Sequence, residues 1–175
     1  MLDLTLETVD LRALLLEAVE AATPQASSTG VSITCHLGAS LRIAGDRRRL
    51  VQVMTNLLSN AVKYTLTGGM VTIAGNVAGG RVVVTFTDTG IGISEADRAN
   101  LFTRFFRCSE AVDRQIPGTG LGLVVTKKIV DAHNGASLKS KASPASAQRL
   151  RSNSPPSMSM RCLARPKSPP ESLSG

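Results

Sequence analysis

Residues 46–65, DRRRLVQVMTNLLSNAVKYT, carry two side-chain patterns on one predicted helix. Apolar residues recur at steps of three and four, which predicts a stripe facing a core: Leu50, Val53, Met54, Leu57, Leu58 and Ala61. A second, polar set recurs at the same steps on another face: Gln52, Asn56, Asn60 and Lys63. Three carboxamides and an ammonium in register indicate either an ordinary solvated face or a binding face. The helix alone leaves both interpretations open.

Length and composition indicate one globular domain. The chain has 175 residues, of which 42% are hydrophobic and only 3% aromatic, so we expect a sizeable, mainly aliphatic core. No apolar run reaches the length of a membrane span, and the acidic start MLDLTLETVD does not resemble a signal peptide. The three cysteines are scattered and form no CxxC pair, which favours reduced thiols in the cytoplasm over a zinc site.

The net charge of +7 belongs almost entirely to the C-terminal end. Residues 139–175 hold seven of the 20 Lys and Arg, one of the 13 Asp and Glu, and six of the eight Pro. Such a composition buries too little apolar surface to order a chain, so we expect residues 141–175 to be a disordered basic tail. Because the tail lacks aromatic residues, we expect weak general affinity for nucleic acid and no specific nucleic-acid partner.

Periodicity elsewhere predicts two more long helices and several strands. The helices are expected at 10–29, with Asp10 as the cap and Pro24 kinking or ending the helix, and at 119–133. Strands are expected at 31–36, 41–44, 70–77, 81–88 and from 136 onward. Gly79 and Gly80 suit a tight hairpin turn. A short helix is expected to start at Ser94, whereas residues 108–118 look like an irregular, mobile loop.

An acidic residue follows three apolar residues at the same parity in the strand 81–88. Because Val82, Val84 and Phe86 predict the buried side, Asp88 points toward the core or the rim of a pocket, and its carboxylate needs a hydrogen-bond donor. An alternative is that Asp88 simply binds the turn that follows it.

Two glycine clusters, DTGIG (88–92) and GTGLG (118–122), let the backbone approach a ligand closely. The second cluster runs directly into a helix, whose bare amides favour an anion such as a phosphate. Neither cluster has the third glycine of the dinucleotide-binding fingerprint, and the chain contains no P-loop.

The order of four motifs is the strongest signal: NLLSNAVKYT (56–65), DTGIGI (88–93), LFTRFFR (101–107) and GTGLGL (118–123). Together they closely resemble the ATP-binding catalytic domain of sensor histidine kinases, in the superfamily of DNA gyrase, heat-shock chaperones and mismatch-repair ATPases. The resemblance covers about 45–138. It implies a two-layer α+β sandwich, with a mixed sheet of about five strands packed on three helices and a flexible ATP lid. We divide the chain into an extension (1–9), this domain (10–140) and the tail (141–175).

The resemblance implies ATP and Mg²⁺ as ligands and assigns roles to the motif residues. Asn60 would coordinate Mg²⁺, with Asn56 beside it, and Lys63 would neutralise phosphate charge. Tyr64 would lie along the nucleoside, and Asp88 would accept a hydrogen bond from the adenine amino group.

The glycine clusters and the lid would complete the site. Gly90 and Gly92 would shape the adenine floor. Residues 103–120 would be the lid, carrying Arg104, Arg107 and Arg114. Arg107 is the best candidate to stabilise charge on the transferred phosphoryl group and, with Asn60, is assigned a catalytic role. Five consecutive residues would contact phosphate or hinge the lid: Gly118, Thr119, Gly120, Leu121 and Gly122.

Neither histidine resembles the phosphoacceptor of this family. His36 lies in a predicted strand and His133 at the end of the last helix. Only about ten residues precede the first helix, so we expect no dimerisation hairpin. We therefore predict no autophosphorylation: the γ-phosphate would pass to a histidine on a separate dimerisation and phosphoacceptor protein, with a response regulator downstream.

Two other functions share the same pocket. The chain could be a nucleotide-binding regulatory partner without turnover, or a serine kinase that binds a sigma factor, although LFTRFFR argues against the latter. A second departure from the family is the tail, because ASLKSKASPA (136–145) begins the closing-strand pattern and then gives way to Arg, Ser and Pro. We hypothesise a change of reading frame after about residue 145, which would leave an unpaired sheet edge.

Overall fold

The computed structural model describes residues 3–133, 136–141 and 157–162. The helices are α1 (Leu11–Ser28), α2 (Arg47–Tyr64), α3 (Glu95–Arg98), α4 (Ser109–Asp113) and α5 (Gly122–Ala132). The strands are β1 (Glu7–Asp10), β2 (Ser32–Leu37), β3 (Arg42–Gly45), β4 (Met70–Ala78), β5 (Arg81–Asp88), β6 (Ser137–Lys141) and β7 (Ser157–Cys162). None of the helices in these residues is both long enough and apolar enough to cross a membrane.

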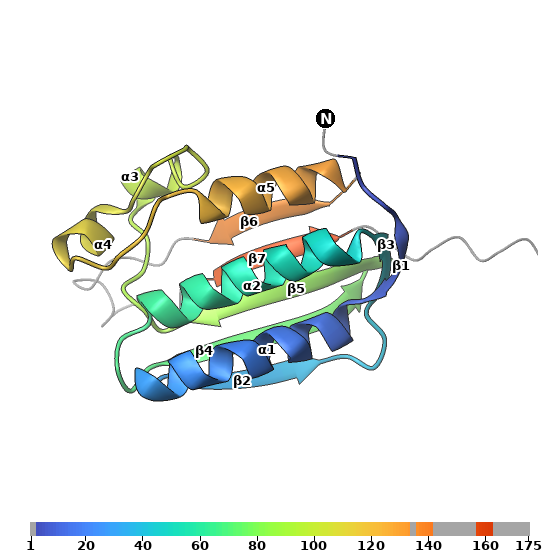
Figure 1. Ribbon diagram of the computed structural model, residues 1–175, viewed down its shortest axis with the longest axis horizontal. Coiled ribbons are helices and arrows are strands. Elements are labelled where there is room, and N and C mark those ends of the chain that lie inside the picture. Colours follow the sequence, from blue (N-terminus) through green and yellow to red (C-terminus); the bar gives the residue numbers. More distant parts are fainter. Residues whose placement is uncertain (1–2, 134–135, 142–156, 163–175) are drawn as a thin grey trace, which may run out of the picture.

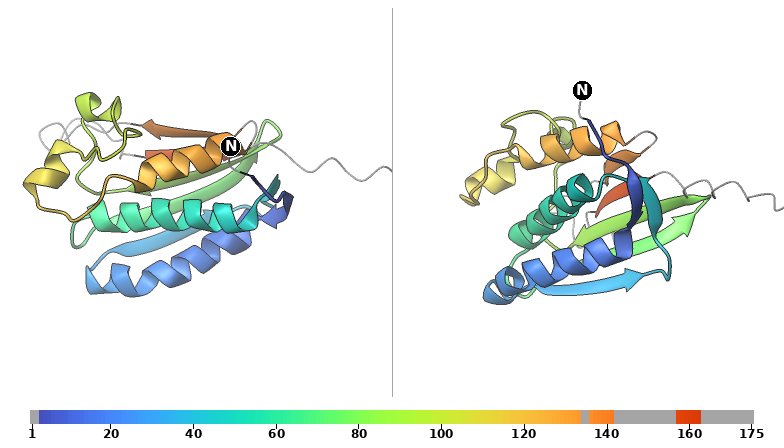
Figure 2. Two further views of the ribbon diagram at one scale, coloured as in Figure 1. Left: turned by 45° about the horizontal axis from the view of Figure 1, so that its top comes forward. Right: turned by 45° about the vertical axis from the view of Figure 1, so that its right-hand side comes forward.

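The domain has two layers, a five-stranded sheet and a layer of three helices (Figure 1). The strand order is β2-β4-β5-β7-β6; β2 and β4 run parallel, and the other neighbours run antiparallel. Helices α1, α2 and α5 lie side by side on one face of this sheet in all three views (Figures 1 and 2). This arrangement confirms the predicted mixed sheet on three helices.

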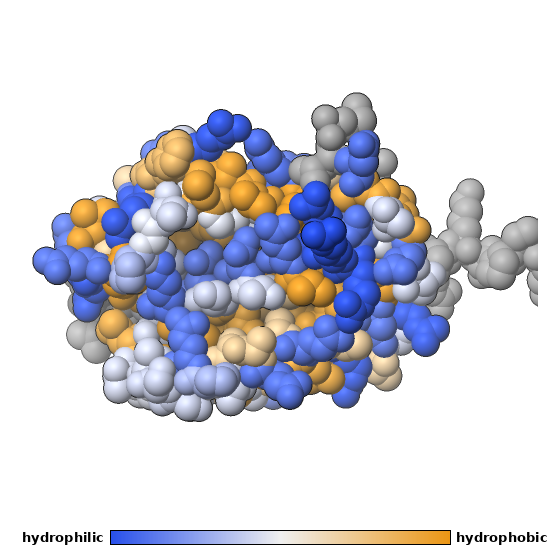
Figure 3. Space-filling model, in the orientation of Figure 1, coloured by the Kyte–Doolittle hydropathy of each residue, from blue (hydrophilic) through white to orange (hydrophobic). Residues whose placement is uncertain are grey.

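Helix α2 lies in the middle of the helical layer and confirms the predicted stripe. Its buried residues are Leu50, Val53, Met54, Leu57, Leu58, Ala61 and Val62. Burial of each larger side chain contributes about 2 kcal/mol. The Asp46 carboxylate caps the helix by accepting a hydrogen bond from the amide of Arg49 at 3.0 Å. Three consecutive arginines begin this helix, and Figure 3 shows strongly hydrophilic surface over that end.

Helix α1 does not end at Pro24, which was one of the two outcomes expected there. Asp10 caps the helix as predicted, with its carboxylate accepting from the amide of Arg12 at 2.9 Å. Beyond Pro24 the helix continues to Ser28, because Ala26 in its last turn is buried in the core. Pro24 itself lies on the exposed side, where water can satisfy the carbonyl that loses its partner.

Strands β4 and β5 form the predicted hairpin. Ala78 pairs with Arg81, and both residues between them, Gly79 and Gly80, have positive φ values of 57° and 73°. Two positive φ values are what a two-residue turn with the sheet's own twist requires. The hairpin brings the end of β5, with Asp88, beside the end of α2.

Regular structure extends beyond the predicted domain range 10–140 at both ends. Strand β1 lies mostly in the predicted extension and pairs with β3. Strand β7 lies in the predicted tail and pairs with β5 on one side and β6 on the other. The expectation that 141–175 lacks regular structure is therefore wrong for Ser157–Cys162. The remaining tail, 142–156 and 163–175, lies outside the described residues, and the reading-frame hypothesis stays a prediction.

Two boundaries in the predicted lid also differ. Helix α5 begins at Gly122 rather than 119, because Gly120 has a φ of +68°, which a helix cannot contain. Residues 108–118 are not wholly irregular, since they include α4. A contact with α3 stabilises the start of this short helix. The Asp97 carboxylate on α3 accepts hydrogen bonds from the amide and the hydroxyl of Ser109, at 3.2 and 3.0 Å.

Candidate functional site

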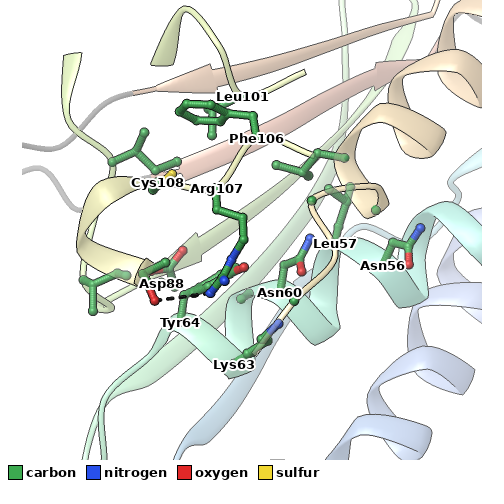
Figure 4. Close-up of a pocket in the computed structure, with 18 of the residues that line it drawn as sticks. Asn56, Leu57, Asn60, Lys63, Tyr64, Asp88, Leu101, Phe106, Arg107 and Cys108 are labelled. Carbon is green, nitrogen blue, oxygen red and sulfur yellow. Dashed lines mark hydrogen bonds between the residues drawn. The ribbon is translucent and has the colours of Figure 1, made fainter. Parts of the chain in front are cut away.

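The polar face of α2 lines a cavity of about 380 Å³ between this helix, the end of β5 and the segment 101–123 (Figure 4). Four predicted site residues on α2 contribute to its wall: Asn56, Asn60, Lys63 and Tyr64. These side chains point toward the cavity because the apolar stripe of α2 packs into the core. The structure thus favours a binding face over a solvated one.

Most of the predicted residues outside α2 also line this cavity. They are Asp88, Gly92, Arg107, Gly118, Thr119, Gly120 and Gly122. Gly90 and Leu121 are not in the lining, and neither are Arg104 and Arg114. Arg114 instead makes a 2.7 Å ion pair with Glu110 one turn earlier.

Gly90 fixes how the end of β5 meets the end of α2. A side chain at Gly90 would collide with the Tyr64 carbonyl oxygen, and the next amide, of Ile91, donates to that same oxygen at 3.0 Å. The Gly90 amide donates to Asp88 Oδ1 at 2.9 Å, so Asp88 does bind its own turn. This contact uses one oxygen of a carboxylate that can accept several hydrogen bonds, and Asp88 also lines the cavity. The turn contact and a ligand contact are therefore compatible.

Positive charge gathers where α2 faces the lid. Burial and the nearby charge of Arg107 lower the pKa of the Lys63 ammonium from its ordinary value of 10.5. The ammonium also lies 5.2 Å from the centre of the Tyr64 ring. Burial raises the pKa of the Tyr64 phenol, which keeps it neutral. Two neighbouring cations in one cavity favour an anionic ligand.

Arg107 reaches from the lid segment toward Tyr64 in Figure 4, but it also holds the lid together. One of its terminal nitrogens donates to the carbonyl of Ile116 and, at 3.5 Å, to that of Ala111. Its Nε is buried with no hydrogen-bond partner among the described residues. The side chain could therefore gain hydrogen bonds by moving toward a ligand.

Sequence reasoning missed the apolar part of the wall, formed by Leu57, Ala61, Phe86, Ile91, Ile93, Leu101, Phe106, Ala111 and Leu123. The apolar residues of LFTRFFR were a usable signal. Leu and Phe side chains on one side of an otherwise polar region are expected to pack against an apolar surface, such as the wall of a pocket. Cys108 lines the cavity as well. Burial, with a smaller effect of the Asp97 carboxylate, raises the pKa of its thiol to about 11, so this cysteine is poorly nucleophilic at neutral pH.

The donor set of the cavity fits Mg²⁺ held against phosphates. The described residues contain no group of three or more His, Cys, Asp or Glu that could hold a metal by themselves. Magnesium commonly binds through one or two protein oxygens and completes its shell with phosphate oxygens and water. The side-chain oxygens of Asn56 and Asn60 are suitable ligands of this kind.

The sequence and structure match one family. A family model described as "Histidine kinase-, DNA gyrase B-, and HSP90-like ATPase" matches residues 45–156. The chain belongs to this ATPase family, and its domain is of the histidine kinase type.

Curated relatives and solved structures agree with this assignment. The chain is 38% identical over 131 residues to "Sensor-like histidine kinase SenX3" of Mycolicibacterium smegmatis, covering 75% of this chain and 34% of that protein. It is 39% identical over 127 residues to "Signal transduction histidine-protein kinase BaeS" of Escherichia coli, covering 73% and 27%. The structure of "Mycobacterial sensor histidine kinase MprB" has a TM-score of 0.76 at 26% identity, with 93% and 100% covered. The chain thus spans about a third or less of the curated relatives' length.

Proposed function

We propose that this chain binds Mg-ATP in the cavity beside α2 and transfers the γ-phosphate to a histidine of a two-component signalling system. The observation that supports this most directly is the division of the cavity into two ends. Asp88 lies on one side of the cavity in Figure 4, and the carboxamides of Asn56 and Asn60 and the ammonium of Lys63 lie on the other. A nucleoside triphosphate has the same two parts: a base that forms hydrogen bonds and a chain of phosphates that carries negative charge.

At the purine end, Asp88 accepts from the adenine amino group, Tyr64 lies along the nucleoside, and Gly90 and Gly92 shape the floor. At the phosphate end, Asn60, with Asn56, would hold Mg²⁺, and Lys63 neutralises phosphate charge. When bound, Mg²⁺ would supply neutralisation of charge between the phosphates.

The lid completes these proposed contacts. Gly118, Thr119, Gly120, Leu121 and Gly122 present backbone amides to phosphate at the start of α5. Arg107 stabilises charge on the transferring phosphoryl group. The buried Nε of Arg107 supports this role, because it is a donor in the cavity wall that has no hydrogen-bond partner within the described part of the chain.

We infer that the phosphoacceptor is a histidine outside these 175 residues, on a separate phosphoacceptor protein in the cytoplasm, with a response regulator downstream. Neither histidine of the chain suits the reaction. His133 is buried; its Nε2 accepts from the Asp46 amide at 3.0 Å, and its Nδ1 lies 2.8 Å from the Ile129 carbonyl oxygen. His36 is exposed on strand β2, away from the residues that line the cavity.

Transfer to a separate protein is tested with labelled ATP and a cognate hairpin protein that carries the acceptor histidine. We expect acid-labile phosphate on the partner and none on this chain, and Asn60→Ala should abolish the transfer. Acid-labile label on the chain alone would contradict the proposal. Tight ATP binding without any transfer would favour a regulatory partner, and acid-stable phosphate on a serine would favour a serine kinase.

The shifted pKa of Lys63 predicts a pH dependence of nucleotide binding. A bound phosphate favours the charged ammonium and so raises a pKa that burial and Arg107 have lowered from 10.5. Binding therefore takes up protons, and ATP affinity falls as the pH rises toward 10.5. Titration calorimetry at several pH values measures this, with Lys63→Met expected to remove the dependence. The control Lys128→Met, at an exposed position of α5, should retain it. Equal slopes in both variants would rule out Lys63 as the group responsible.

A further inference from the structure

A buried polar contact joins α5 to the polar face of α2 outside the cavity. Thr126 on α5 is 0% exposed and is absent from the cavity lining. Its hydroxyl oxygen accepts a hydrogen bond from Nδ2 of Asn56 at 3.4 Å. Thr23, Thr29 and Thr65 behave differently: each donates its hydroxyl to the carbonyl four residues earlier. The hydroxyl of Thr126, in contrast, takes part in a hydrogen bond that joins two helices, α5 and α2.

The contact determines which end of the Asn56 carboxamide faces the cavity. A carboxamide has an NH₂ that only donates and an oxygen that only accepts, and only the oxygen can bind a cation. With Nδ2 on Thr126, Oδ1 remains for the cavity. A side chain built at Gly122 would lie 4.0 Å from Asn56 Oδ1 and 3.9 Å from Asn60 Nδ2. Both carboxamides therefore face the first turn of α5, where Gly122 leaves the space open.

We propose that Thr126 is a positioning residue for the nucleotide site: it holds the Asn56 carboxamide with its oxygen toward the metal-bearing phosphates. This inference rests on the proposed binding of Mg-ATP. Without the hydroxyl, the Asn56 NH₂ loses its partner, and the amide turns to satisfy it elsewhere. The oxygen then leaves the cavity, although Thr126 never touches the nucleotide.

If Thr126 served only to fill space between the helices, valine and serine substitutions would have different effects from those expected of a positioning residue. Valine has nearly the shape of threonine and fills the same space between α2 and α5, whereas serine keeps the hydroxyl and loses a methyl group. A purely structural Thr126 would therefore tolerate valine and be sensitive to serine. A positioning Thr126 would show the reverse pattern in metal-dependent binding.

The test measures the affinity of the 175-residue chain for a non-hydrolysable ATP analogue with and without Mg²⁺. We define the Mg²⁺ gain as the factor by which Mg²⁺ increases affinity for the analogue. We expect Thr126→Val to retain the thermal midpoint and the Mg²⁺-free affinity of the wild type, and its Mg²⁺ gain to be about fivefold smaller. We expect Thr126→Ser to lower the thermal midpoint and keep the gain. In an Asn56→Ala background, Thr126→Val should have no further effect on the gain, because the group it positions is gone.

The outcomes separate this inference from the function on which it rests. A wild-type chain that fails to bind the analogue overturns the proposed function. A wild-type chain that binds it with a normal Mg²⁺ gain, while Thr126→Val keeps the full gain, overturns only the role of Thr126. Equal losses from Thr126→Val with and without Asn56 would also overturn it.

Discussion

Replacing Asp88 with Asn is expected to weaken ATP binding about a hundredfold. The substitution keeps the size and shape of the side chain and leaves an oxygen for the Gly90 amide, whose bond to Asp88 is 2.9 Å long. It replaces the other oxygen with an NH₂, which would face the adenine amino group as donor against donor. A lost charged hydrogen bond together with an unpaired buried donor costs roughly 3 kcal/mol, and every 1.4 kcal/mol is tenfold in affinity.

The base provides the sharpest control for Asp88. Inosine triphosphate carries a carbonyl oxygen where ATP carries the amino group, so the wild-type chain should prefer ATP and Asp88→Asn should lose or reverse that preference. Asp113→Asn removes the same charge from an exposed position of α4 and should change neither affinity. Calorimetry of the three proteins with both nucleotides measures all six combinations. An Asp88→Asn variant that keeps its preference for ATP would show that another group recognises the purine.

The parts of this domain that could be predicted from the sequence are those determined by local patterns. The stripe of α2 follows from a spacing of three and four, and the β4–β5 turn follows from two adjacent glycines. Asp88 at the cavity follows from its parity with Phe86. In each case residues within one element decide the outcome, so a single sequence is sufficient.

The missed parts depend on partners far away in the sequence. Strand β7 has the alternation SMSMRC, but it lies in a Ser-, Pro- and Arg-rich segment whose average composition hides it. Its place in the sheet is decided by β5, about 75 residues earlier, and by β6. Strand β1 likewise depends on β3, and α4 depends on the contact of Ser109 with Asp97. No local pattern contains these pairings.

The candidate site shows the same division. Motif residues that contact the cavity could be named because their types and order are distinctive. Thr126 could not be assigned a role, because a threonine on a helix is most simply an ordinary core or surface residue. Its importance comes from a hydrogen bond across the α2–α5 interface to a residue 70 positions earlier. Supporting contacts of this kind become visible only when the helices are placed side by side.

Replacing Gly120 with Ala is expected to disrupt the lid and weaken ATP binding at least thirtyfold. Gly120 has a φ of +68°, and a side chain there would lie 2.6 Å from the Phe106 carbonyl oxygen and 2.8 Å from the Phe105 Cα. The obstruction is backbone, so it cannot be relieved by rotating a side chain. Phe105 is itself held at a φ of +62°. Forcing these segments apart costs roughly 2–4 kcal/mol, and it moves Phe106 and Arg107 away from the cavity wall.

Gly68 separates the steric effect at Gly120 from the cost of the backbone conformation. It has a φ of +80°, and a side chain there would meet nothing within 4 Å. Gly68→Ala should therefore lower the free energy of unfolding by about 1 kcal/mol, the cost of a left-handed conformation, and leave ATP affinity unchanged. Hydrogen exchange of residues 103–120 should increase only in Gly120→Ala. If both variants bind ATP equally well, close packing of Gly120 against Phe105 and Phe106 is not needed to hold the lid over the nucleotide.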